Sequence, residues 1–126
     1  MTETGKATIT PIFGGRQLRM DFTGSFMGTP FEGVGYNGYD INAGKYINSW
    51  TDSGSTAVMN ATGDYDAASK TYTFTGPMPD MKTVGGVAIG RHTLRVVDPD
   101  HLLMEMFETK EGKEVRTMQM EYTRVK

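Results

Sequence analysis

The sequence has no cysteine. This absence excludes disulfide bonds, thiolate metal ligands and cysteine nucleophiles, and it fits a reducing compartment, so we expect a cytoplasmic protein. The sequence also lacks an apolar run of the roughly 18 residues that a membrane helix needs. Residues 1–6 lack the apolar core of a signal peptide. We therefore expect neither a membrane partner nor secretion.

The sequence also has little excess of one sign of charge over the other. The 13 basic and 15 acidic side chains give a net charge of −2, and no basic cluster is present. Nucleic-acid-binding domains carry basic patches, so this class is excluded. Two histidines without cysteine do not suffice for a typical zinc site, and we expect no metal and no cofactor. No G-x-S-x-G motif and no recognisable Ser, His and acid cluster is present, which leaves catalysis open with no pattern in its favour.

Glycine, by contrast, is abundant. The 16 glycines stand between short runs rich in Thr, Val, Ile, Tyr and Phe, which is typical of an all-β protein. No window of about 11 residues has the period of a helix. We expect strands near residues 6–12, 16–26, 31–39, 45–52, 57–65, 70–75, 87–97, 101–108 and 114–124. Segment 76–86 carries two prolines and is expected to be an irregular loop. With no linker, residues 1–126 are expected to form a single domain.

The last three predicted strands can be aligned against one another. A three-residue hairpin loop at 111–113 pairs Met106 with Met118, Met104 with Met120, and Leu102 with Tyr122. A loop of odd length at 98–100 adds His92, Leu94 and Val96 to this methionine-rich face. Such a meander has one apolar side, and curling nine strands into an antiparallel barrel would bury that side.

The opposite face of the same strands carries Arg91, Arg95 and Glu105. If this face points to solvent, these residues are expected to form weak cross-strand ion pairs. If it points inward, an arginine there becomes a candidate anion-binding residue.

The alternation of side chains also predicts a core. The expected buried residues are Leu18, Met20, Phe22, Leu94, Met104, Met106, Met118 and Tyr122. Arg19, Asp21 and Glu121 are expected to be largely exposed.

Several stretches together resemble a known family. They are residues 14–18, 25–33, 38–40, 45–53, 105–108, 112–114 and 118–124, which include Lys45-Tyr46-Ile47-Asn48-Ser49-Trp50-Thr51-Asp52-Ser53. In order and spacing, from about residue 6 to the C-terminus, the sequence resembles the bacterial domain-of-unknown-function family 1579. The resemblance implies a lipocalin-type, calycin-like antiparallel barrel without an established activity. Family members carry an additional N-terminal strand with a Trp-x-Gly motif. Its absence implies an incomplete barrel with an exposed edge, and such an edge favours a homodimer.

His92 shares its predicted face with apolar residues, where an imidazole is costly unless it is hydrogen-bonded. It could contact a ligand, act as a general base or bind a haem. The plainer alternative is a structural histidine bonded to a neighbouring strand. The other histidine, His101, follows a turn and is expected to be solvated.

Trp50 and Asp52 share a predicted strand face with Tyr46 and Asn48. An aromatic ring, an amide and a carboxylate at this spacing suit the mouth of a polar pocket. The alternative is a core tryptophan followed by an acid that opens a turn.

Residues 33–38 form a G-x-G-x-x-G pattern, Gly33-Val34-Gly35-Tyr36-Asn37-Gly38. A dinucleotide fingerprint needs a helix that starts within the pattern, but a turn at 42–44 follows instead. We interpret the glycines as sites of strand curvature or close packing.

The ten methionines are unusual for this length, and flexible thioethers can adapt to apolar ligands or fill a core. The leading hypothesis is a non-enzymatic binding module for a small apolar or amphipathic ligand. Its candidate ligand-binding residues are His92, Trp50, Asp52, Tyr122, Met104, Met106 and Met118. A second hypothesis is an interaction protein with a filled core that assembles through its exposed edge. A third is an enzyme or haem protein centred on His92.

Overall fold

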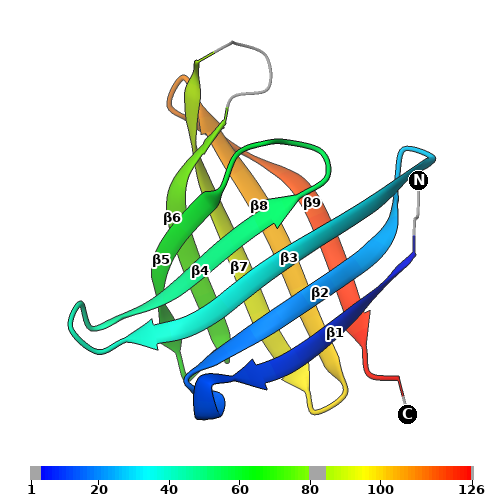
Figure 1. The fold of residues 1–126 in the computed structure, drawn as a ribbon. Helices are drawn as coiled ribbons and strands as arrows, with labels where there is room; N and C mark the ends of the chain where they lie inside the picture. Colours follow the sequence, from blue (N-terminus) through cyan, green and yellow to red (C-terminus); the bar gives the residue numbers. More distant parts are fainter. Residues whose placement is uncertain (1–3, 80–84, 126) are drawn as a thin grey trace. The chain divides into compact units, whose positions relative to one another are not determined.

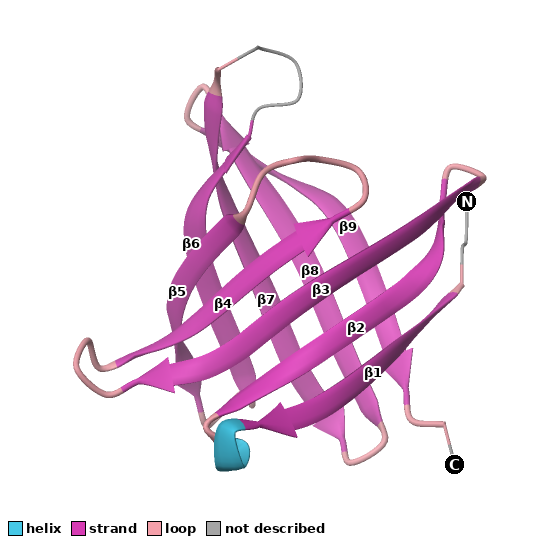
Figure 2. Cartoon of the chain, in the orientation of Figure 1, coloured by secondary structure: helices cyan, strands magenta, loops and turns pink. Residues whose placement is uncertain are grey.

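The computed structural model describes residues 4–79 and 85–125, and strands dominate them (Figure 2). The strands are β1 Gly5–Ile12, β2 Gln17–Phe26, β3 Thr29–Asp40, β4 Lys45–Asp52, β5 Met59–Asp66, β6 Thr71–Pro79, β7 Val87–Asp98, β8 His101–Lys110 and β9 Lys113–Thr123. Every pairing described is antiparallel and joins strands that are consecutive in the chain. The predicted all-β, antiparallel, up-and-down meander is therefore confirmed.

The predicted strand positions agree with the structure to within four residues at each end. Within the described residues the single helix is η1, the three-residue 3₁₀ turn Phe13–Gly15 between β1 and β2. The expectation of no substantial helix is met there.

Residues 1–60 and 61–126 form two compact units. Each unit contains a run of antiparallel strands, and each is described by itself. The single-domain prediction and the closure of a barrel concern both units together and stay predictions.

In the unit of residues 1–60, strands β1 to β4 lie side by side as long twisted ribbons (Figure 1). One row across this sheet runs from Ile9 on β1 through Met20 and Gly35 to Trp50 on β4. Because side chains alternate along a strand, the residues two positions away belong to the same face. This face therefore carries both apolar side chains and the predicted polar site at the end of β4.

In the unit of residues 61–126, one row runs from Phe74 on β6 through His92 and Met106 to Met118 on β9. The predicted pairs Met104 with Met120 and Leu102 with Tyr122 are also present. We call this side of β6–β9 the methionine face. It is defined by Tyr72, Phe74, His92, Leu94, Val96, Leu102, Met104, Met106, Met118, Met120 and Tyr122.

The predicted loop between β8 and β9 was wrong even though the register was right. Lys110 pairs with Lys113, so the turn has two residues, Glu111 and Gly112, both with positive φ. Such a turn matches the right-handed twist of the strands. A β-bulge between Met106 and Phe107 then shifts the pairing by one residue and restores the register that a three-residue loop would have produced.

The prediction of an irregular loop at 76–86 was wrong for its first part, because β6 continues through Pro79. Pro77 and Pro79 are two residues apart, so both lack an N–H group on the same edge of β6. The described pairing with β5 ends at Thr75, whereas the ladder to β7 continues to Pro79. Proline is tolerated in a strand when its missing donor faces away from a paired neighbour. Residues 80–84 lie outside the described part of the chain.

The predicted core was largely wrong. Leu18 is 44% exposed, and the other predicted core residues are only half-buried: Met20, Phe22, Leu94, Met104, Met106, Met118 and Tyr122. Among the described residues, the buried hydrophobic side chains are Phe74 and Ala88, at 4% and 5% exposure. Alternation predicts which residues share a face, but it does not predict how deeply that face is covered.

The predicted exposed residues behave differently from one another. Glu121 is exposed, as expected. Arg19 and Asp21 are only partly exposed, since their side chains lie together with 2.9 Å between Nη2 and Oδ1.

The turn between β2 and β3 offers a test of backbone strain. Phe26 pairs with Thr29, and the two residues between them, Met27 and Gly28, have φ of 52° and 79°. Positive φ is unfavourable for methionine and well tolerated by asparagine. Met27→Asn should therefore raise the free energy of unfolding by about 0.5–1 kcal/mol, measured by urea denaturation. Met27→Leu, which keeps the strained conformation, should leave stability unchanged, and equal effects of both substitutions would contradict the strain argument.

Candidate functional site

His92 is the central polar residue of the methionine face. It lies opposite Met106 on β8, and its ring stacks on Phe74 of β6 with 4.9 Å between ring centroids and 18° between planes. Phe74 in turn stacks on Tyr72, with centroids 6.5 Å apart. The imidazole therefore sits among aromatic rings and thioethers.

Burial removes water from the His92 imidazole and lowers its pKa to about 4. The ring is consequently neutral at pH 7. Among the described residues no side chain or backbone group hydrogen-bonds to it, so the structural bond to a neighbouring strand is not found there. No unpartnered polar side-chain atom of the described, non-exposed residues is completely buried, so both ring nitrogens keep contact with solvent-accessible space.

The structure brings the other predicted residues of this unit onto the same face as His92. Met106 and Met118 lie in its row, Met104 lies in the next row, and Tyr122 pairs with Leu102 farther along. All four side chains are half-buried. Burial raises the pKa of the Tyr122 phenol, so this group is also neutral at pH 7. The set offers a mostly apolar surface with two neutral hydrogen-bonding groups.

Glu108 and Lys110 were not predicted as site residues. They lie two and four residues after Met106 on β8, so their side chains are on the same face as Met104 and Met106. Glu108 pairs with Gly90 of β7, and its carboxylate Oε1 lies 3.3 Å from the Lys110 Nζ. Counting every second residue beyond Met106 could have found them. They place an ion pair at the end of the methionine face.

Trp50 and Asp52 form a second group, in the unit of residues 1–60. The indole Nε1 donates a hydrogen bond of 2.7 Å to Asp52 Oδ2, and the Gly54 amide donates one of 2.9 Å to Asp52 Oδ1. The ring lies against the backbone of β3, since a Cβ atom at Gly35 would be 2.7 Å from Trp50 Cε3 and one at Gly33 would also clash with the ring. The glycines of the G-x-G-x-x-G pattern thus lie within a strand, and Gly33 and Gly35 make room for the indole.

Two amides lie beside this tryptophan in the next row of the sheet. Asn48 Nδ2 donates a hydrogen bond of 2.7 Å to Asn37 Oδ1. One row farther, the rings of Tyr39 and Tyr46 meet edge to face with centroids 4.8 Å apart. The predicted face of Tyr46, Asn48, Trp50 and Asp52 is therefore present. This face belongs to the unit of residues 1–60, whereas His92 belongs to the unit of residues 61–126.

The side of β7–β9 opposite the methionine face carries ion pairs, as predicted for a side that points to solvent, although the partners of Arg91 and Glu105 are residues of β9 that were not predicted. Arg91 Nη2 lies 2.6 Å from Glu114 Oε1, and Arg116 Nη1 lies 3.0 Å from Glu105 Oε2. Arg91 also stacks over the Phe107 ring at 4.2 Å. Arg91 of β7 is engaged by a carboxylate of β9, across β8, and Arg116 of β9 by a carboxylate of the adjacent β8, which does not favour an anion site. Exposed pairs of this kind contribute only tenths of a kcal/mol each.

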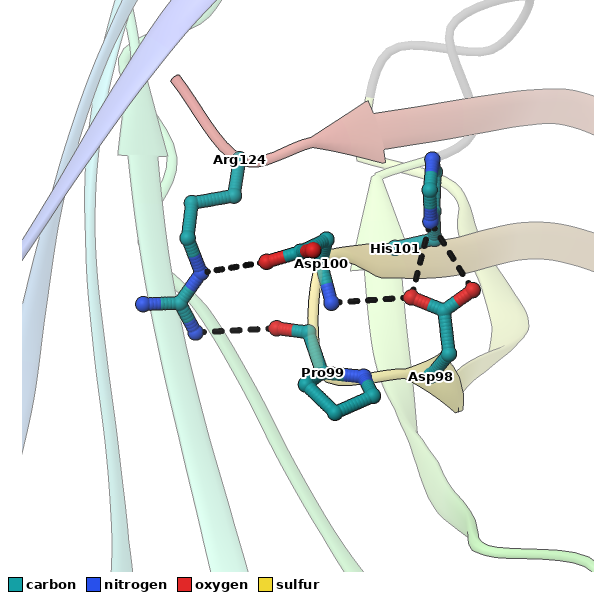
Figure 3. A network of polar contacts seen from close by, with 5 residues as sticks. All are labelled: Asp98, Pro99, Asp100, His101 and Arg124. Carbon is teal, nitrogen blue, oxygen red and sulfur yellow. Dashed lines mark hydrogen bonds and ion pairs between the residues drawn. The ribbon is translucent and has the colours of Figure 1, made fainter. Parts of the chain in front are cut away.

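A polar network closes the turn between β7 and β8 (Figure 3). His101 Nδ1 lies 2.8 Å from Asp98 Oδ1, and this hydrogen bond lowers the pKa of the Asp98 carboxyl. Arg124 donates a hydrogen bond of 2.9 Å to the Pro99 carbonyl and lies 3.3 Å from Asp100. His101 is thus exposed but paired, rather than simply solvated. The contact of His101 with Asp98 stabilises the turn, and the contacts of Arg124 tie the chain after β9 to the same turn, so both roles are structural.

Across residues 4–79 and 85–125, no group of three or more His, Asp or Glu side chains is arranged to hold a metal ion. No helix in these two ranges has the length and apolarity required to span a bilayer.

The low pKa of His92 predicts a loss of stability in acid. In the unfolded chain this residue binds a proton near pH 6.5, whereas in the folded chain it binds one only near pH 4. The stability contributed by the neutral ring is present above pH 6.5 and declines as the pH falls towards 4, by roughly 3 kcal/mol. Urea unfolding over this range should show the decline, and His92→Phe should flatten it. His101→Phe should leave it in place, and an unchanged decline in His92→Phe would assign it to other groups.

No curated protein matches this chain. The model of one protein family does match it, over residues 1–124, which is nearly the whole chain. That family is described as "Protein of unknown function (DUF1579)". The chain belongs to this family, as the motifs of its sequence indicated.

Proposed function

We propose that this protein is a non-enzymatic binding module that takes a small apolar or amphipathic ligand on the methionine face. The observation that carries the proposal is His92, a neutral and mostly buried imidazole with no hydrogen-bond partner among the described residues. Both ring nitrogens keep contact with solvent-accessible space, so water can bond them in the free protein. A ligand that covers the ring must replace those hydrogen bonds, because an unsatisfied polar group costs free energy. A ligand with a polar end can do so.

The surroundings of His92 supply the apolar part of the recognition. Met104, Met106 and Met118 are half-buried, so they keep surface that a ligand can cover. Thioether side chains have three rotatable bonds and adapt to ligands of varied shape. Ligand sites of this type are mostly apolar with a few polar groups that orient the ligand. On this face, the neutral polar groups are those of His92, Tyr122 and Tyr72.

The proposal predicts that hydrophobic and polar recognition can be separated. The fluorescent probe N-phenyl-1-naphthylamine should bind, and dodecanol should displace it. His92→Phe keeps a ring on Phe74 but removes both nitrogens, so the probe should bind within about twofold while dodecanol weakens three- to tenfold, for a lost hydrogen bond of about 1 kcal/mol. His101→Phe is the matched control and should change neither value. Absence of probe binding, or equal dodecanol affinity in both variants, would refute the proposal.

A second candidate function is self-association into a homodimer. It is favoured by apolar side chains left open on the Trp50-bearing face of β1 and β2, where Ile9 is 48% and Leu18 is 44% exposed. Exposed apolar patches often mark interfaces. A net charge of only −2 opposes the approach of a second copy weakly.

Sedimentation at micromolar concentration should then give about twice the chain mass of 13.9 kDa. Leu18→Lys should shift the protein to monomer, because a charge would enter the interface. Ile41→Lys changes a turn residue that is 83% exposed and should leave the dimer intact. A wild-type monomer would exclude this candidate without affecting ligand binding.

A further inference from the structure

The unit of residues 1–60 carries a surface whose ligand does not depend on the proposed function. We call it the indole platform. It consists of residues in three consecutive rows on one face of β3 and β4: Gly33 with Asp52, Gly35 with Trp50, and Asn37 with Asn48.

The indole of the platform is held in one orientation from two sides. One face of the ring lies against the β3 backbone at Gly33 and Gly35, and its Nε1 is bound to Asp52 at 2.7 Å. Trp50 is nevertheless only half-buried. The ring is a flat apolar surface whose orientation is fixed before any ligand arrives, and part of the residue stays accessible.

Polar groups lie at both ends of this flat surface. Asp52 and Asn48 lie two residues to either side of Trp50 on β4. Their Cα atoms are about 13 Å apart along the strand. The single hydrogen bond between Asn48 and Asn37 leaves Asn48 Oδ1 as a free acceptor and Asn37 Nδ2 as a free donor among the described residues. Each Asp52 oxygen already accepts one hydrogen bond and can accept another. Packing of a tryptophan alone does not require these open groups.

We infer that the indole platform binds a pyranose sugar ring. Such a ring has a flat C–H face that packs on an indole, and hydroxyl groups at its rim that both donate and accept hydrogen bonds. The Asp52 carboxylate lies at the indole Nε1 and the amide pair lies in the next row on the other side of the ring, so hydroxyls on opposite carbons of the sugar can hydrogen-bond at both ends. A ring with all hydroxyls equatorial fits best, because an axial hydroxyl would lift it from the indole.

Two other ligand classes fit the platform less well. A hydrocarbon chain would cover the carboxylate and the amides without satisfying them, which costs free energy. A single flat heteroaromatic ring would stack on the indole but has no hydroxyls that reach both ends.

Trp50 is the only tryptophan of the chain, so tryptophan fluorescence reports on the platform alone. Titration with methyl β-D-glucopyranoside, whose hydroxyls are all equatorial, should shift the emission and saturate, with half-saturation at about 1 mM for a ligand of this size. Adenine serves as the heteroaromatic probe. No saturable change with the glucoside up to about 0.1 M, or tighter binding of adenine, would overturn the inference.

Substitutions then locate the binding. Asn48→Ala removes the amide pair and should raise the half-saturation concentration about tenfold, whereas Asn60→Ala, an exposed asparagine on β5, should leave it unchanged. Saturation-transfer NMR of the glucoside does not need indole emission, so it can test Trp50→Phe, which should lose most of the signal. Circular dichroism confirms that each variant is folded. Equal titrations of Asn48→Ala and Asn60→Ala would place the sugar elsewhere and overturn the inference.

Discussion

Antiparallel pairing of consecutive strands is the interaction on which both candidate surfaces depend. Side chains alternate between the two faces of a strand, so a slip of one residue in any pairing would move a whole row of side chains to the other face. The rows that contain His92 and Trp50 exist because β7 pairs with β8, and β3 with β4, in the registers observed. Neither surface is formed by one segment of sequence. Each requires neighbouring strands to place residues that are distant in sequence side by side.

Local backbone chemistry sets these registers. Between β8 and β9, a two-residue turn at Glu111 and Gly112 would by itself align the strands differently from what is observed. The bulge beside Met106 compensates and keeps the thioethers of β8 and β9 on one face. At Met27 the chain adopts the same kind of turn with an unfavourable residue. The hairpins therefore hold their geometry partly against local preference, because the pairing of the flanking strands outweighs the strain of one residue.

The two surfaces differ in how their polar groups are satisfied. On the methionine face, His92 is neutral and has no partner among the described residues, so its ring nitrogens are open to water. On the indole platform, Asp52 and the Asn37–Asn48 pair are engaged by hydrogen bonds that also fix their positions. The first arrangement suits an adaptable apolar site with one polar contact. The second suits a rigid flat site with polar groups at its margins, where little conformational entropy is lost on binding.

The sequence by itself determined the all-β class, the positions of nine strands, the residues that share the methionine face and the alignment of Trp50 with Asp52. These follow from the period of two and from turn residues, which act over a few positions. The tertiary structure alone decided that Leu18 stays exposed, that β6 continues through Pro79 and that the indole lies on Gly33 and Gly35. It also decided that His92 finds no partner on a described neighbouring strand. Burial, edge pairing and ring contacts depend on which strands lie beside a residue and what covers them, and alternation along one strand carries no information about either.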